Sequence, residues 1–350
     1  MKKQFLTLAL SIVTFASFAT IRTADNNGSN PGNYTSLQKA IDDSNAGDTI
    51  YLKASASSYG DIVLNKPLTI IGDGALSMKP DIKKTFVNKV RVETDAAGSA
   101  LIGFKAENIE VGNINKLLLD RLRVTHVGGL NGVSVGDWSS VLIRNCYCWH
   151  LVIPEGKTTD VYIDNSVFNS LDSQNRLKNN YIVSNSIILL LKGSGSGTIR
   201  NSILQLYYSQ ESYKHQLFEN NLFVNEAKEN DFLTRLSTNS ILNGNNFVVP
   251  SFNEIFKNYN LVININLDVT TNINLDETTD LRLVDGSKGK NAGTDGKDMG
   301  IYGGAFPWGD SYFSNPGLAP QVPHVMDIQT VSQTPNKASI DVNIKAKSIK

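Results

Sequence analysis

Two histidines of this chain stand at a spacing that would let them act together. His126 and His150 are 24 residues apart, as are Arg121 and Asn145, which occupy one position of an internal repeat. Equal offsets predict that the two imidazoles stack on neighbouring turns of the repeat. Such a pair titrates near neutral pH and can serve as general base and general acid. The alternative is that both are unrelated surface residues in loops of different shape.

Other side chains with suitable chemistry are expected beside these histidines, just after the second strand of each repeat. Loops in this place vary in length, and variable loops are where a solenoid carries its function. The candidates for substrate binding are Asn131, Trp149, Arg176, Tyr207 and Tyr208. Aromatic rings offer flat platforms, and a guanidinium pairs with a carboxylate. The alternative for the aromatic residues is that they cover an apolar flank of the fold.

Arginines and aspartates alternate in the first part of the repeat. Arg121, Arg123 and Arg144 would suit the carboxylate of a uronic acid. Asp120 and Asp164 alternate with them, and this pattern favours a solvated ladder of ion pairs.

No motif for a metal ion is present, and the sequence leaves open whether calcium is needed. Asp295 and Asp298 lie in a glycine-rich run that would suit calcium, but carboxylates beside glycine are mostly turn formers. Cys146 and Cys148 are the two cysteines. A disulfide between them would close a strained ring, and two thiols alone do not complete a four-coordinate site. We expect two small buried thiols on one strand.

The repeat that positions these residues is marked by asparagines. Six segments of similar pattern contain Asn145, Asn165, Asn185, Asn201, Asn220 and Asn245, at spacings of 20, 20, 16, 19 and 25 residues. Arg121 takes the same place one turn earlier. A unit of this length with two short β runs and no helical period predicts one turn of a solenoid.

The pattern around each asparagine predicts a bend between two strands. Residues four and two before it are mostly apolar and face the core, while the residue just before it is polar and faces solvent. Asparagine tolerates the left-handed backbone conformation that a sharp bend requires. Stacked on successive turns, the side-chain amides are expected to bond to one another in an asparagine ladder.

The ends of the chain complete the predicted fold. Residues 36–43 form a short amphipathic helix that caps the first coil, and residues 338–346 pair with residues 325–331 as a hairpin. We expect an all-β protein, a right-handed parallel β-helix with a short N-terminal capping helix and a small C-terminal β appendage. The boundaries are 1–19 for a signal peptide, 20–33 for a flexible lead-in, 34–313 for the β-helix, and 314–350 for a linker and hairpin tail.

The first residues predict export. Lys2 and Lys3 precede an apolar run of about 14 residues, too short to span a bilayer, and Ala19 suits cleavage. The mature chain is expected to be periplasmic, cell-surface or secreted, without a transmembrane segment. The 350 residues carry 33 Lys plus Arg and 33 Asp plus Glu, and we find no basic run. Nucleic-acid binding is therefore not expected.

Two stretches resemble known families. SLQKAIDDSNAGDTIYL followed by KPLTIIGDG resembles the opening of the pectin-lyase-like superfamily, especially lyases of the alginate and chondroitin type. DMGIYGG and NPGLAPQVPHV resemble exported β-helix proteins of Bacteroidetes. The resemblance implies the β-helix and contact with long polysaccharides. It carries over no catalytic set, because the motifs of polygalacturonases, pectate lyases and alginate lyases have no counterpart here.

Two functions remain open at this point. In the first, the exported protein binds acidic polysaccharide along the flank of the solenoid, with or without cleaving it. In the second, it is a non-catalytic surface, adhesion or spacer module. The oligomeric state is open in both.

Overall fold

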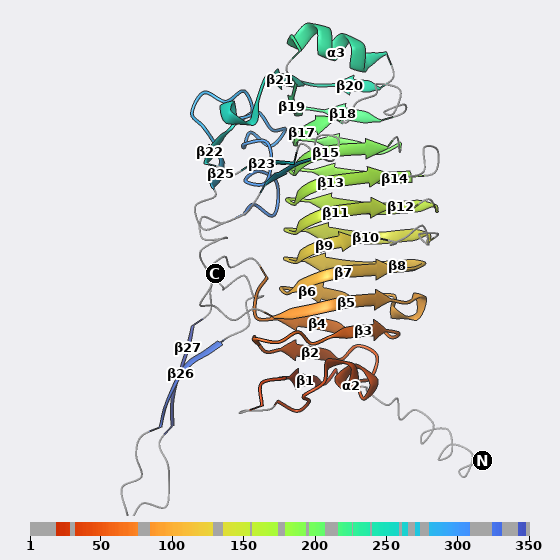
Figure 1. Cartoon of the computed structure of the whole chain (residues 1–350), viewed down its shortest axis with the longest axis vertical. Coiled ribbons are helices and arrows are strands. Elements are labelled where there is room, and N and C mark those ends of the chain that lie inside the picture. The colour runs from red at the N-terminus through yellow and green to blue at the C-terminus, as the bar shows by residue number, and fades with distance from the viewer. Residues whose placement is uncertain are drawn as a thin grey trace, which may run out of the picture.

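The chain folds into an elongated solenoid of short parallel strands (Figure 1). The structure is a computed structural model that describes residues 19–28, 32–75, 85–128, 136–154, 156–173, 179–193, 196–206, 216–225, 227–238, 240–258, 261–264, 270–273, 280–308, 324–330 and 342–347. Successive strands alternate between two sheets, so each turn of chain adds one strand to each sheet. The predicted parallel β-helix is confirmed.

Among the described residues, eleven strands form the first sheet, which we call sheet A. In order they are β1 (Ile21–Ala24), β2 (Thr49–Leu52), β4 (Thr69–Gly72), β6 (Ala100–Ile102), β8 (Ile114–Asp120), β10 (Trp138–Arg144), β12 (Thr158–Asp164), β14 (Asn179–Ser184), β16 (Thr198–Arg200), β18 (Leu217–Glu219) and β20 (Ile241–Asn243). Ten described strands form the second sheet, sheet B. They are β3 (Asp61–Leu64), β5 (Phe86–Val92), β7 (Lys105–Val111), β9 (Arg123–Val127), β11 (Tyr147–Ile153), β13 (Val167–Ser173), β15 (Ile187–Gly193), β17 (Ile203–Leu206), β19 (Leu222–Val224) and β21 (Phe247–Val249).

The repeated asparagine makes the corner between the two sheets. It has a positive φ of 54° at Asn145, 44° at Asn165 and 49° at Asn185, and Arg121 takes its place with a φ of 53°. The predicted bend is therefore confirmed. The last repeat differs, because Gly244 adopts the left-handed conformation there with a φ of 62°. Glu219 pairs with Asn243 and Leu222 with Phe247, so this turn holds one extra residue and Asn245 is displaced by one position.

The ladder of side chains along this corner is formed by serines one position later. The Ser186 hydroxyl accepts a hydrogen bond from the backbone N–H of Ser166 at 3.2 Å and donates to the carbonyl of Ser184 at 2.8 Å. Ser202 repeats the arrangement, accepting from the N–H of Ser186 at 3.1 Å. Each serine thus ties its own turn to the preceding one. The asparagine side chains bond elsewhere, so the expected asparagine ladder is replaced by a serine ladder.

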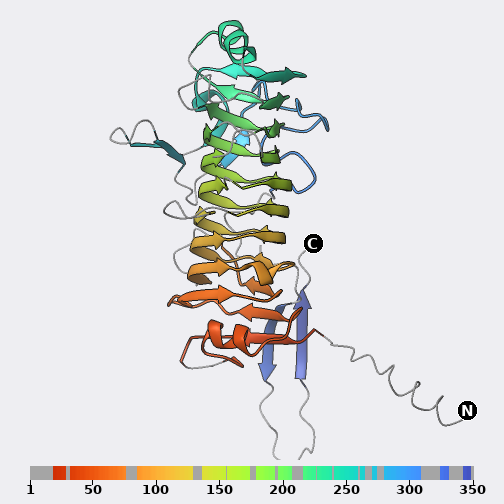
Figure 2. The ribbon, with the colours of Figure 1, turned by 90° about the vertical axis from the view of Figure 1, so that its right-hand side faces the viewer.

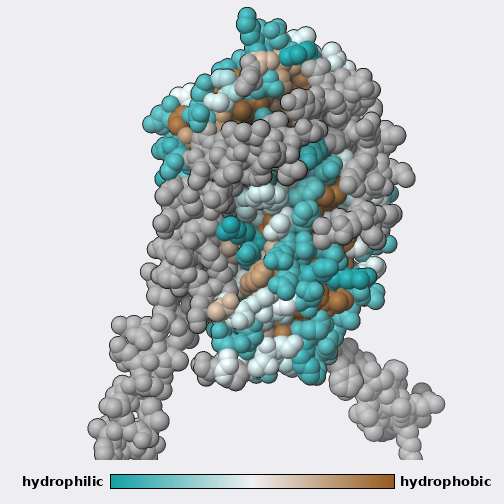
Figure 3. Space-filling model, viewed as in Figure 1, coloured by the Kyte–Doolittle hydropathy of each residue, from teal (hydrophilic) through white to brown (hydrophobic). Residues whose placement is uncertain are grey.

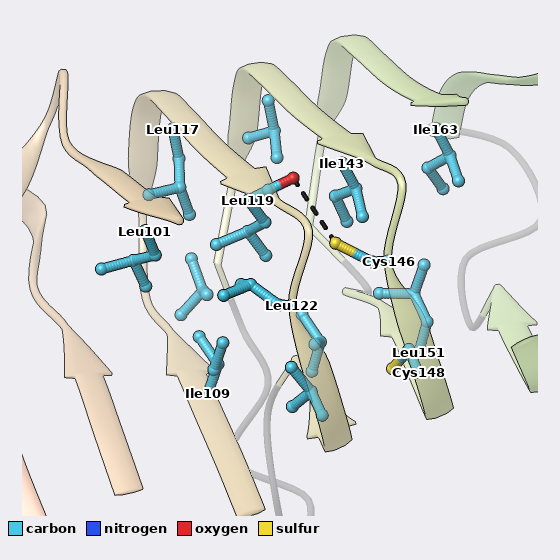
Figure 4. Packing of buried hydrophobic residues seen from close by; sticks show 14 of the residues in the cluster. Leu101, Ile109, Leu117, Leu119, Leu122, Ile143, Cys146, Cys148, Leu151 and Ile163 are labelled. Atoms are coloured by element: carbon cyan, nitrogen blue, oxygen red, sulfur yellow. Dashed lines mark hydrogen bonds between the residues drawn. The ribbon is translucent and has the colours of Figure 1, made fainter. Parts of the chain in front are cut away.

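The interior of the coil is filled by aliphatic and aromatic side chains from both sheets. Figure 4 shows Leu119, Ile143 and Ile163 stacked on successive turns, with Leu151 facing them from sheet B. Cys146 lies in the same core, with its Sγ 3.6 Å from the carbonyl oxygen of Leu119. Cys146 and Cys148 are both buried free thiols, as expected, although Cys146 precedes β11 rather than lying within it. Stacking of like residues gives one continuous core.

Short helices close both ends of the coil. The predicted N-terminal helix is α2 (Leu37–Asp42), whose first turn is capped by the Ser36 hydroxyl accepting from the N–H of Lys39. A second helix that the sequence did not reveal, α3 (Glu229–Ser237), lies at the opposite end (Figure 1). Phe232 and Leu236 of α3 pack into the core, and the Phe232 ring lies 5.3 Å from that of Phe223.

The N-terminal segment contains more structure than the sequence indicated. Within the segment expected as a flexible lead-in, β1 pairs in parallel with β2. Arg22 of β1 contacts the buried carboxylate of Asp48 at 3.3 Å. This ion pair, together with the buried Ala24, explains why the segment joins the sheet.

Sheets A and B end at β20 and β21, and described segments after β21, including residues 252–256 and 281–308, pack on the outside of the coil. The expectation that the coil continues to residue 313 is therefore not met. Residues 280–308 run across the corner of the solenoid, where Asn165 donates to the carbonyl oxygens of Ile301 and Gly303, and Asn201 donates to Thr294 Oγ1. We call residues 280–308 the strap. The DMGIYGG segment, residues 298–304, is part of the strap.

The remaining strands form three small antiparallel sheets in the described part of the chain. They pair β22 (Phe256–Asn258) with β25 (Asp280–Leu283), β23 (Leu261–Asn264) with β24 (Thr270–Ile273), and β26 (His324–Thr330) with β27 (Val342–Lys347). Short 3-10 helices span Thr94–Ala96 and Phe252–Glu254. The pairing of β26 with β27 confirms the predicted tail hairpin.

The predicted signal peptide, residues 1–19, lies almost entirely outside the described residues. In the described part of the chain, no helix combines the length and the apolar character needed to cross a bilayer.

Candidate functional site

The two histidines meet on neighbouring turns of the solenoid. His126 of β9 and His150 of β11 pair directly in the parallel register of sheet B. His150 Nδ1 lies 2.8 Å from His126 Nε2, and the rings meet edge to face with centroids 4.7 Å apart. At this distance one proton lies between the two nitrogens. The predicted stacking is confirmed.

Both histidines lie on the outer face of sheet B, within strands rather than in the loops after them. Cys148 and Leu151 of β11 point into the core of the coil. Tyr147 belongs instead to a separate cluster outside the coil, with residues of the strap. The strands extend further than expected, so His126, Trp149 and His150 are held by a rigid sheet.

Trp149 is an exposed aromatic residue beside the pair. Its side chain is 41% exposed, while most large apolar side chains of the coil are buried. On the same face, the guanidinium of Arg123 lies 5.7 Å from the centroid of the Tyr147 ring. The Tyr147 hydroxyl accepts a hydrogen bond from Asn169 Nδ2 at 3.3 Å. The strip therefore combines an aromatic platform, a cation and hydrogen-bonding groups.

The same face carries further polar residues beside the histidines, and one of them, Ser170, was not predicted from the sequence. Ser170 pairs with His150 in the next strand, β13. Asp172, which pairs with Val152, lies beside Lys192 of β15. A fixed offset from the asparagine was the missed signal. His150 and Ser170 both stand five residues after the corner asparagine of their own repeat.

Burial holds both imidazoles in their neutral form at neutral pH. Burial lowers the pKa of His126. The pKa of His150 is lowered to about 4, mainly by burial and to a smaller extent by electrostatic repulsion from His126 and Lys192. Burial raises the pKa of Asp172, and Lys192 opposes this effect. A neutral imidazole retains a lone pair, so the pair can accept a proton.

The arginines of the repeat separate into two environments. Asp120, expected to face solvent, is 2% exposed and contacts Arg121 at 2.9 Å and Arg144 at 3.2 Å. The Arg144 guanidinium also lies 4.7 Å from the centroid of the Phe306 ring, which belongs to the strap. The ion-pair interpretation is confirmed for Arg121 and Arg144, although the pairs are part-buried. Arg123 stands apart on the outer face of sheet B.

The remaining predicted positions are of two kinds. Asn131, Arg176, Tyr207 and Tyr208 lie outside the described residues. Asp295 accepts hydrogen bonds from the N–H groups of Lys297 and Gly304, as a turn former does. Among the described residues, no three His, Cys, Asp or Glu side chains converge on a point where a metal ion would fit.

On the face drawn in Figure 3, hydrophilic residues form most of the visible surface of the described coil, with single hydrophobic residues among them. No protein-family model matches the chain, and no curated protein matches it. The outer face of sheet B has a distinct chemistry. It offers an uncharged proton acceptor beside a flat aromatic surface and two cations.

Proposed function

We propose that this protein is exported and binds acidic polysaccharide along the outer face of β9 and β11. The observation that carries the proposal is the exposed Trp149 beside the His126–His150 contact. A large exposed aromatic ring on a rigid sheet stacks on the apolar face of a sugar. Arg123 and Lys192, which lie on the same sheet, supply positive charge for the carboxylates of the polysaccharide.

The geometry of the solenoid supports an extended ligand. Neighbouring strands of a sheet lie about 4.8 Å apart, close to the length of one sugar ring in an extended chain. Side chains on successive turns therefore repeat at nearly the spacing of successive sugars. The two caps, α2 and α3, cover the ends of the coil, so the long flank is the surface left for a polymer.

Cleavage is the second part of the proposal. The neutral histidine pair offers a base for removing a proton from a uronic acid, which would make the protein a polysaccharide lyase. The proposed kinship with the pectin-lyase-like superfamily and with exported Bacteroidetes proteins is supported by the parallel coil and by α2 directly before β2. Without cleavage, the protein is a polysaccharide-binding module.

The test of the proposal compares two exposed aromatic residues on different sheets. Trp149→Ala is measured against Tyr162→Ala, a residue of sheet A that is 44% exposed. Binding to alginate, polygalacturonate, chondroitin sulfate and a neutral glucan is followed by affinity electrophoresis. We expect Trp149→Ala to weaken binding to one acidic polymer roughly tenfold and Tyr162→Ala to leave it unchanged.

The same samples distinguish the alternatives. A rise in ultraviolet absorbance from unsaturated uronate products would identify a lyase. Retention without product would identify a binding module. A wild-type protein that none of the polymers retains would contradict the proposal and favour a spacer module.

A further inference from the structure

The outer face of sheet A carries a continuous row of side chains along the solenoid. Figure 2 shows the strands stacked in a nearly straight column between α2 and α3, so residues in the same register position form a line. On strands β8 to β20 the line at the middle of this face consists of Leu118, Leu142, Tyr162, Ile182, Thr198, Leu217 and Ile241. We call these residues the apolar row, because all except Thr198 are apolar or aromatic.

The apolar row faces away from the core and is open to solvent. The side chains before and after it in each strand point inward, as Val141 and Ile143 do on either side of Leu142. All members of the row are at least partly exposed, and Tyr162 and Ile241 are 44% and 63% exposed. The adjacent strands β8 to β20 make the row roughly 29 Å long. A contiguous apolar row of this length on a folded protein indicates an interaction surface.

A second row, two residues later in each strand, alternates in charge. It runs from Arg144 of β10 through Asp164, Ser184 and Arg200 to Glu219 of β18, each in direct register with the next. Arg200 is exposed, and Arg144, Asp164 and Glu219 are partly exposed. Along the solenoid axis the signs are therefore positive, negative, neutral, positive and negative.

Contacts within the chain leave these charges able to meet a partner. Asp120 is shared by Arg121 and Arg144, so the three side chains together keep one net positive charge. Among the described residues, the hydrogen bonds that Asp164 accepts all end on Oδ1, so Oδ2 of this partly exposed carboxylate remains for a cation. Glu219 accepts a hydrogen bond from a neutral amide and keeps its charge.

The order of signs is complementary to itself when it is reversed about Ser184. Two copies can face each other across sheet A with antiparallel solenoid axes. A two-fold axis through β14 then places Arg144 opposite Glu219 and Asp164 opposite Arg200, and each contact occurs twice by symmetry. One surface thus supplies both partners of every charge pair.

Other placements of the axis bring like charges together. An axis through β12 sets Asp164 opposite itself, and an axis through β16 does the same to Arg200. An axis midway between β12 and β14 sets Arg144 opposite Arg200, and one midway between β14 and β16 sets Asp164 opposite Glu219. With parallel solenoid axes, Asp164 meets the exposed Asp160. Like charges in contact disfavour these arrangements, so the charges select the axis through β14.

We infer that two copies of this chain associate through the outer faces of their sheets A, about a two-fold axis through β14. The inference does not rest on the proposed function, because the proposed polysaccharide site lies on sheet B of each copy. Facing sheets pack about 10 Å apart, so the apolar rows meet, with Ile182 opposite Ile182 and Leu142 opposite Leu217. Each copy buries on the order of 500 Å², and about 1,000 Å² in total is the lower limit for a specific contact. We therefore expect a dissociation constant in the micromolar range.

The first test is the mass of the protein in solution. Sedimentation equilibrium of the full mature chain should show a dimer at high micromolar concentration. Ile182→Glu sets two carboxylates against each other on the axis and should weaken the dimer more than tenfold. Val63→Glu, the same kind of change at a position of sheet B that is 37% exposed, is the control and should leave the dimer intact. A wild type that stays monomeric, or a dimer that Ile182→Glu leaves unchanged, would contradict the inference.

Cysteine cross-linking tests the register and needs no disruptive variant. Cys146 and Cys148 are buried, so a short bis-maleimide is expected to react with an introduced, partly exposed cysteine. Ile182→Cys should cross-link with itself. Leu142→Cys and Leu217→Cys should cross-link only when the two variants are mixed. A strong link in Leu142→Cys alone would indicate parallel solenoid axes and overturn the proposed arrangement.

Reversal of one charge tests the pairing across the interface. Arg200→Glu sets a carboxylate opposite Asp164 twice in each dimer and should weaken association about tenfold or more. Arg91→Glu, on sheet B, changes an arginine whose side chain is 63% exposed and should have no effect. Equal dimer affinities for the two variants would refute the charge pairing.

Discussion

The side-chain amide of Asn165 donates to the carbonyl oxygen of Ile301, 136 residues later in the chain, at 2.9 Å. A second bond reaches the carbonyl oxygen of Gly303 at 2.8 Å. Two turns further along the same corner, Asn201 forms two hydrogen bonds with Thr294. The corner asparagines thus do two things. Their backbone turns the chain between sheets, and their side chains dock the strap.

Replacing Asn165 separates these two roles. Asn165→Gly keeps the left-handed corner but loses both bonds to the strap, and should cost about 1–3 kcal/mol. Asn165→Ala should cost roughly 1–2 kcal/mol more, because a non-glycine residue without a compensating side chain is strained at a φ of 44°. Urea unfolding measures both changes.

Hydrogen exchange locates the effect of the Asn165 variants. Backbone amides at residues 300–304 should exchange faster in Asn165→Gly. Asn220→Gly is the control, because the Asn220 side chain accepts from the N–H of Asn245 rather than from the strap. Equal exchange of the strap in the two glycine variants would mean that the asparagine side chain does not hold it.

The serine ladder predicts a large effect from one missing oxygen. Ser186→Ala removes the acceptor of the Ser166 N–H and leaves this backbone group unsatisfied in a fully buried place. It also removes one of two donors to the Ser184 carbonyl, which keeps its bond from the Asn165 N–H. We expect a loss of about 1–3 kcal/mol in the free energy of unfolding. Ser139→Ala removes an exposed hydroxyl that donates to Asn115, and should change it by less than about 0.5 kcal/mol. Indistinguishable urea midpoints for the two variants would refute the ladder.

The histidine pair predicts a pH dependence of stability. The pKa of His150 is lowered to about 4 in the folded state, so between that pH and its ordinary pKa the unfolded chain binds more protons. The stabilisation that depends on a neutral His150 is fully present above a pH of about 6.5 and is lost as the pH falls towards 4. Because the ring is partly solvated, we expect a loss on the order of 1–2 kcal/mol.

His150→Gln supplies the comparison, because it cannot titrate. Melting temperatures at neutral pH and near pH 4.5 should fall further for the wild type than for the variant. Carboxylates such as Asp48, whose pKa is lowered by hydrogen bonds from Thr20 and Asn45 and by Arg22 against the opposing effect of burial, contribute equally to both proteins. Parallel melting curves across this range would argue against a neutral buried imidazole.

Much of the coil could be predicted from spacing alone. The asparagine positions located the corners, and Arg121 and Asn145 correctly implied that His126 and His150 are neighbours. Errors came where local spacing changed, as at Gly244, where one extra residue moved the corner away from Asn245. The helix α3 was missed because its apolar face is short and follows a strand repeat.

The sequence by itself determined the repeat, because left-handed corners and alternating strands are local preferences that recur in each turn. The tertiary structure decided which part of the coil is covered. Asn169 and Ser170 of β13 look like ordinary repeat residues, yet both are buried in the folded chain, where β24 packs against β13. Likewise, nothing local to Asn165 indicates that its partner is Ile301. Burial, and with it the shifted pKa of His150, depends on contacts between segments far apart in the chain, which local preferences do not encode.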